Sequence, residues 1–162
     1  MTFGGLTIQG QSWQGNFQQQ GPWEWKGPVT VETSGLTMTC DTSFKLWPTA
    51  DLSDFERVEA AGNVKVQGRY VTPDKAVWEI RGRAASATYE RKSQLGTLAG
   101  GVHFEASNPV TGAVLTAVGE KLVYDAKSQR FNFERGQEPV RMEWQQPPDK
   151  ATGPSAVSSE GS

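Results

Sequence analysis

The stretch Gly62-Asn63-Val64-Lys65-Val66 carries the pattern that decides the fold. Its glycine, followed by asparagine, supplies a permissive backbone position directly before a run in which apolar and charged residues alternate. Alternation with a period of two predicts a strand with one buried face. The stretch therefore indicates a strand that starts at a bulge or a sharp corner.

Similar strand starts recur three more times, at residues 27–31, 100–104 and 138–142. Their first valines are separated by 35, 38 and 38 residues: Val29, Val64, Val102 and Val140. A second shared piece follows at residues 84–89 and 119–124. We therefore expect units of two or three strands that stack into one continuous sheet. An ordinary β-sandwich with accidental similarity between its strands is the alternative.

The same alternation marks most other segments. Branched or aromatic residues occupy one parity of each run, as in Leu36, Met38 and Cys40, in Leu122 and Tyr124, in Phe131 and Phe133, and in Met142 and Trp144. Polar turns that contain proline separate the runs at residues 72–75 and 108–112. The sequence thus predicts an all-β, antiparallel fold. Only residues 51–61 offer a helix, because Asp51 would cap it and Leu52, Phe55 and Val58 would share one helical face.

Length and charge limit the classes of protein. The chain has 162 residues, enough for one domain, and its 16 basic and 18 acidic residues are too balanced for a nucleic-acid partner. Residues 1–5 lack the layout of a secretory signal, so we expect either a cytosolic protein or one whose leader has been removed. Residues 1–26 are expected to form an edge strand and a loop rich in tryptophan and glutamine, and residues 145–162 a disordered tail.

The residues that commonly carry catalysis are scarce. The single histidine, His103, lies between Val102 and Phe104 and is expected to face solvent on a strand. The single cysteine, Cys40, shares the parity of Met38 and is expected to be a buried, inert thiol. One histidine and one cysteine provide neither a catalytic triad nor a zinc or haem site. We therefore expect no enzymatic activity, no catalytic residue, no metal and no cofactor.

The order and spacing of these pieces resemble the OstA-like family of lipopolysaccharide transport proteins. The resemblance covers residues 27–144 and rests on residues 55–66, 84–89, 98–102 and 115–125. It implies a V-shaped, slit-like jelly roll, open along one side, with an apolar interior that holds lipid acyl chains. It also implies a periplasmic protein whose copies stack edge strand to edge strand between two membranes.

From this resemblance we expect a non-enzymatic carrier that binds the acyl chains of lipopolysaccharide and passes the lipid toward the outer membrane. A hydrophobic slit suits this task, because burial of methylene groups is favourable and non-directional. The residues expected to line the slit are Val29, Val31, Val64, Val66, Trp78, Ile80, Ala87, Tyr89, Val102, Phe104, Leu122 and Tyr124. Arg81 and Arg83 are expected to meet the phosphates of the headgroup.

The expected partners are lipopolysaccharide or a related glycolipid, other lipopolysaccharide transport proteins, and further copies of the chain, which would pair through edge strands at residues 6–8 and 140–144. The alternative function is that of a secreted β-sandwich module that binds carbohydrate. Such a module would stack sugars on exposed tryptophans, here Trp13, Trp23, Trp25 and Trp47. The two hypotheses differ in whether the aromatic side chains lie inside the protein or on its surface.

Overall fold

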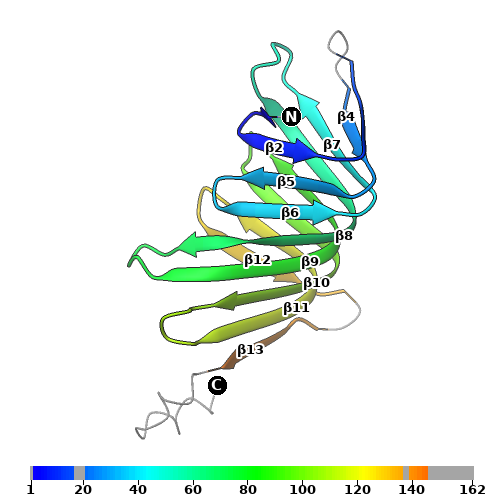
Figure 1. Cartoon of the computed structure of the whole chain (residues 1–162). Helices are drawn as coiled ribbons and strands as arrows, with labels where there is room; N and C mark the ends of the chain where they lie inside the picture. Colours follow the sequence, from blue (N-terminus) through cyan, green and yellow to red (C-terminus); the bar gives the residue numbers. More distant parts are fainter. Residues whose placement is uncertain (1, 17–20, 137–138, 146–162) are drawn as a thin grey trace, which may run out of the picture.

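The computed structural model describes residues 2–16, 21–136 and 139–145. These residues form thirteen strands and no helix, and all the strands belong to one antiparallel sheet that does not close into a barrel (Figure 1). The strands are β1 (Thr2–Phe3), β2 (Leu6–Gln9), β3 (Ser12–Gln14), β4 (Trp23–Lys26), β5 (Val29–Thr33), β6 (Leu36–Cys40), β7 (Ser43–Pro48), β8 (Phe55–Val71), β9 (Val77–Glu90), β10 (Leu95–Ser107), β11 (Val114–Asp125), β12 (Arg130–Glu134) and β13 (Arg141–Gln145).

The sheet is folded along its middle into two arms. The first arm contains β1, β2, β5, β6 and β13, and the second contains β3, β4, β7 and β12. The four long strands β8 to β11 run through both arms, and the arms meet along one side of the molecule, as Figure 1 shows. The result is the open V-shaped jelly roll that the sequence predicts.

The repeated strand starts form the corner of the V. The register between β8 and β9 shifts between Ala61 and Val64, and that between β10 and β11 shifts between Ala99 and Val102. At the first of these bends the N–H of Asp41 donates to the carbonyl of Gly62 over 2.7 Å, which joins one corner to the next. The strand starts at residues 62–66 and 100–104 are therefore repeated corners, whereas residue 138 of the fourth start lies outside the described residues.

The expected helix at residues 51–61 is wrong. Asp51 caps a turn instead: its carboxylate accepts hydrogen bonds from the hydroxyls of Ser53 and Thr49 and from the N–H of Ser53, at 2.7, 2.8 and 3.1 Å, and these bonds lower its pKa to about 2. β8 then starts at Phe55. A bulge pairs Pro48 with Phe55 but Trp47 with Arg57. The bulge changes the parity of the strand, so two apolar residues three positions apart share a face and imitate helical spacing.

Two details at the ends of the chain also differ from the expectation. The expected edge strand at residues 6–8 is β2, which is not an edge because it pairs with both β1 and β5. Gln145, placed in the expected tail, is the last residue of β13. The other expected edge, at residues 140–144, corresponds to β13, which pairs with β11. Residues 146–162, and residues 17–20 of the expected N-terminal loop, lie outside the described residues.

Two neighbouring glycines at the corner of β10 allow the close contact between corners to be tested, because only one of them makes it. Gly100 and Gly101 both have positive φ angles, of 88° and 69°. A Cβ at position 100 would lie 2.6 Å from the Cβ of Ala85, whereas one at position 101 would meet nothing within 4 Å. We expect Gly101→Ala to lower the free energy of unfolding by about 1–2 kcal/mol, from the left-handed backbone alone.

For Gly100→Ala we expect a larger loss of about 2–5 kcal/mol, because the clash with Ala85 adds to the same backbone cost. Urea denaturation of both variants measures the difference. Equal losses would mean that close contact between neighbouring corners contributes nothing to stability.

Candidate functional site

The apolar side chains of both arms point toward each other and form two clusters. The cluster in the N-terminal half of the stack includes Ile8, Trp23, Trp25, Phe44 and Leu46. The cluster in the C-terminal half includes Ala84, Val102, Phe104, Ala117 and Leu122. We call the surface that carries these residues the inner face of the sheet and the opposite surface the outer face.

All twelve residues expected to line the slit lie on the inner face. Eleven of them belong to the two clusters or pack against them: Val29, Val31, Val64, Val66, Trp78, Ile80, Ala87, Tyr89, Val102, Phe104 and Leu122. The twelfth, Tyr124, packs its ring 4.6 Å from that of Phe131, which in turn contacts Phe104. The structure therefore brings the expected lining residues together on one surface.

The inner face is sealed in its N-terminal half. Trp23, Phe44 and Leu46 have exposed fractions of 2% or less, and their rings and branches fill the space between the arms. Val29 and Val64 in this half are buried to the same degree, and so is Val102 in the cluster of the C-terminal half. In this structure these three expected lining residues are packed core, with no surface left for a ligand.

The inner face is exposed at the C-terminal end of the stack, in β12 and β13, although Phe104, Ala117 and Leu122 in the same half are buried. Phe131, Trp144 and Met142 expose 42%, 45% and 59% of their surface although they lie on the apolar side of the sheet. Glycine at position 96 lies between Tyr89 and Tyr124 in neighbouring strands and adds space between the two rings. We call this part the open inner surface, which comprises Trp78, Ile80, Tyr89, Leu98, Leu115, Tyr124, Phe131, Phe133, Met142 and Trp144.

Two sets of contacts tie the arms together on the side opposite the corner. The guanidinium of Arg91, beyond the end of β9, donates to the carbonyl of Gly4 at 3.0 Å and to the carboxylate of Asp54 at 2.8 Å. It also lies 4.3 Å above the ring of Phe55. The hydrogen bond from Arg91 holds the pKa of Asp54 below its ordinary value, so the carboxylate is ionised at neutral pH.

The second set joins the two arms nearer the C-terminal end. The hydroxyl of Tyr70 in the first arm is 3.3 Å from the side-chain oxygen of Gln129 in the second, and its ring packs edge-on against Phe131. Sequence reasoning missed Arg91, Asp54 and Tyr70 as residues that hold the arms together. They lie far apart in the sequence and show no common pattern, so no sequence signal pointed to them.

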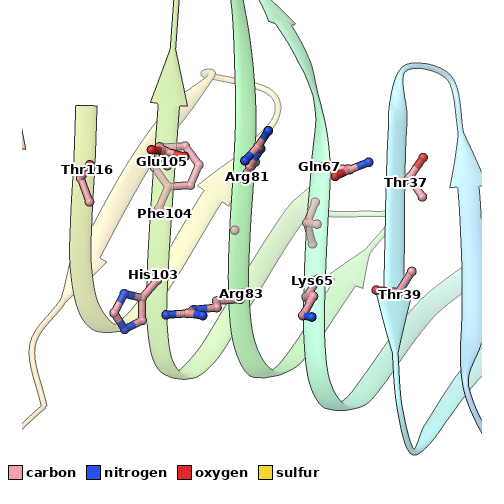
Figure 2. Close-up of a pocket in the computed structure, with 12 residues that line it drawn as sticks. Thr37, Thr39, Lys65, Gln67, Arg81, Arg83, His103, Phe104, Glu105 and Thr116 are labelled. Carbon is pink, nitrogen blue, oxygen red and sulfur yellow. The ribbon is translucent and has the colours of Figure 1, made fainter. Parts of the chain in front are cut away.

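Arg81 and Arg83, the residues expected to meet a headgroup, lie on the outer face. Figure 2 shows them in a hollow of about 550 Å³ that spans β6, β8, β9, β10 and β11, together with Lys65, Gln67 and His103. Val66 and Phe104, two of the expected lining residues, and Gly82 between them also border the hollow. The structure therefore does not bring the two arginines together with the other expected lining residues.

His103 and Cys40 lie where the sequence predicts. His103 is exposed on the outer face. Cys40 is 1% exposed, its thiol donates to the carbonyl of Ser43, and burial raises its pKa. The described residues contain no group of three potential metal ligands. They also contain no helix long and apolar enough to cross a membrane.

The tryptophans contradict the carbohydrate-binding alternative. Trp23 and Trp25 are only 2% and 3% exposed, so neither can stack on a sugar. Trp13 is 38% exposed, but its ring is tilted by 74° and 53° to those of Trp23 and Trp25. Trp47 lies apart from these rings, beside Arg57. The exposed, coplanar platform that this alternative requires is absent among the described residues.

Comparison with known proteins supports the fold. The structure is similar to the crystal structure of LptH, the LptA homologous periplasmic component of the lipopolysaccharide transport device of Pseudomonas aeruginosa, with a TM-score of 0.62. The alignment has 21% sequence identity and covers 88% of this chain and 95% of that chain. No family model and no curated protein sequence matches. The chain therefore has an LptA-like fold.

The contact at Arg91 predicts a local effect. Arg91→Ala removes the link between the β1–β2 turn and the second arm, so we expect amide exchange of Leu6–Gln9 to become about fivefold faster. That factor corresponds to about 1 kcal/mol, the sum expected for a half-exposed ion pair and a cation–π contact. Arg69→Ala, which removes an arginine with no ion pair among the described residues, is the control. Equal exchange in both variants would show that Arg91 does not tie the arms.

Proposed function

We propose that this protein is a non-enzymatic lipid carrier of the periplasm, which binds the acyl chains of lipopolysaccharide between its arms and passes the lipid toward the outer membrane. The observation that carries the proposal is the open inner surface, where Phe131, Trp144 and Met142 expose apolar area inside the V. The LptA-like fold supports it, because LptH is a periplasmic component of a lipopolysaccharide transport device.

Elementary energetics support an acyl chain as the ligand. Each buried methylene contributes roughly 0.8 kcal/mol, so a chain of about twelve carbons contributes on the order of 8–10 kcal/mol before the cost of ordering it. The open inner surface offers ring faces and branched side chains without a buried charge. A ligand held only by such contacts slides with little change in energy, as a carrier needs for release.

The polar headgroup would stay at the open side of the V, where the arms end in polar loops. Arg91, Gln129 and the hydroxyl of Tyr70 lie there. This side, rather than the hollow that holds Arg81 and Arg83, is continuous with the open inner surface. The geometry thus favours the open side over the two arginines for the headgroup of a lipid bound between the arms.

Paired crosslinking positions test the proposal. Tyr89 and Tyr124 lie on the inner face, and their chain neighbours Thr88 and Val123 lie on the outer face. We expect a photoreactive amino acid at Tyr89 or Tyr124 to crosslink to lipid A, and the same group at Thr88 or Val123 to give little product. Equal yields at inner and outer positions would refute binding between the arms.

A bulky residue placed on the inner face tests lipid binding between the arms in a second way. A Cβ at Gly96 would meet its nearest neighbour, the ring of Tyr89, at 3.7 Å, which is an ordinary van der Waals distance, so the backbone accepts a side chain here. We expect Gly96→Trp to reduce lipid A capture by about tenfold by occupying the space between Tyr89 and Tyr124. Thr97→Trp, on the outer face, is the matched control and should capture as the parent does.

We further propose that copies of the chain stack through their end strands, with lipopolysaccharide and other lipopolysaccharide transport proteins as partners. β1 and β13 end the first arm, while β3 and β12 end the second. Addition of a strand to such an edge satisfies its backbone groups and would extend both arms and the inner face.

Association should therefore depend on β13 and increase with concentration. Met142 and Trp144 are its exposed inner residues, so we expect Met142→Lys with Trp144→Lys to prevent association by placing charges at the contact. Arg141→Lys with Glu143→Gln, on the outer side of the same strand, is the control. Light scattering over a range of concentrations measures the effect, and a parent protein that stays monomeric throughout would refute stacking.

A further inference from the structure

The hollow on the outer face contains two rows of polar residues that cross the first arm. The row nearer the corner consists, in ladder order, of Thr39, Lys65, Arg83 and His103. The next row consists of Thr37, Gln67, Arg81, Glu105 and Thr116. Figure 2 shows both rows on the same face, with the side chains projecting from neighbouring strands.

The row nearer the corner juxtaposes positive charges. The two charges are those of Lys65 and Arg83, which are directly opposite each other, and Arg83 is also directly opposite the imidazole of His103. Neighbouring strands lie about 4.8 Å apart, and like charges directly opposite each other destabilise a sheet. The row continues in β13 to a further cation, Arg141, across Val118. No acidic residue occupies this row in β6, β8, β9, β10, β11 or β13.

The other row carries carboxylates at its two ends, Glu32 in β5, opposite Thr37, and Glu143 in β13, opposite Thr116. None of the ion pairs between described residues includes Lys65, Arg81 or Arg83. Glu105 is opposite Arg81 in the other row, and Asp41 at the corner accepts a hydrogen bond from Asn63. Three cationic side chains and one carboxylate therefore leave the hollow with two surplus positive charges in a protein whose net charge is −2.

We propose that this hollow is a binding site for a phosphorylated saccharide, distinct from the inner face. A phosphate between Lys65, Arg83 and His103 would receive charge-assisted hydrogen bonds and relieve the repulsion within the row. Thr37, Thr39 and Gln67 offer hydroxyl and amide groups to a sugar, and Glu105 offers an acceptor for its hydroxyls. The volume of about 550 Å³ lies within the range of small-molecule sites.

Direct titration tests the site. We expect glucose 1-phosphate to shift the backbone amide resonances of residues 65–67, 81–83 and 103–105 in a saturable manner, and glucose to shift none of them. Lys65→Gln with Arg83→Gln should weaken the binding of glucose 1-phosphate at least tenfold. Arg69→Gln with Lys121→Gln removes the same two charges outside the hollow and should leave the affinity unchanged. No saturable shift, or equal weakening by both pairs, would overturn the site.

Inorganic phosphate serves as the second probe. Weaker binding than that of glucose 1-phosphate is expected, because the phosphate alone does not reach the threonines and Gln67. Equal affinity for the two probes would overturn the assignment of a saccharide. Thermal unfolding at low salt gives an independent readout, since relief of repulsion should raise the midpoint of the Lys65→Gln/Arg83→Gln variant without ligand. A lower thermal midpoint for this variant than for the parent would overturn the inference that Lys65 and Arg83 repel each other.

The source of the saccharide is distinguished by vesicles that carry lipid A. If the Lys65→Gln/Arg83→Gln variant loses binding to these vesicles as well as to glucose 1-phosphate, the site takes a saccharide borne on a lipid. If it loses only glucose 1-phosphate, the ligand is a soluble saccharide. The proposal does not depend on acyl-chain binding, because crosslinking of lipid A at Tyr89 in the same variant reports on the inner face separately.

Discussion

Close contact between successive corners is the constraint on which the rest of the structure depends. At β8 a Cβ on Gly62 would lie 2.7 Å from the Cβ of Thr42, so only glycine lets the two chain segments approach as they do. The φ angle of 90° at the same residue turns the strand from one arm into the other. Because each corner stacks on the next, the apolar sides of the two arms remain opposite each other along the stack.

The two faces of this folded sheet have different chemistry. The inner face is apolar, and its filling decreases from the tightly packed Trp23 and Phe44 to the exposed Met142 and Trp144. The outer face of the first arm carries cations such as Lys65 and Arg83, which form no ion pair with another described residue. One strand supplies both faces, since residues alternate between them. The proposed lipid contact and the proposed phosphate contact therefore arise from alternate residues of β8 to β10.

Much of this arrangement follows from the sequence. The alternation of apolar residues, together with the glycines before Val64 and Val102, predicts the strands, the corners and the set of inner residues. A bulge defeats the same reasoning at residues 55–58, because one unpaired residue changes the parity and imitates a helix. Alternation also predicts the face of the sheet on which a residue lies, but not how far the opposite arm buries that residue. Sequence reasoning therefore did not distinguish Val29, which is sealed, from Tyr89, which is only partly buried.

The unequal filling of the inner face gives the molecule a direction. Buried aromatic side chains close the N-terminal end of the inner face, whereas apolar side chains are exposed at its C-terminal end, in β12 and β13. In a head-to-tail array, the sealed N-terminal end of one copy would face the exposed apolar C-terminal end of the next. The sealed ends would leave no continuous channel between the arms through which a lipid could pass along the array. It would have to pass each sealed end along the open side of the V, or else the side chains of Trp23 and Phe44 would have to move.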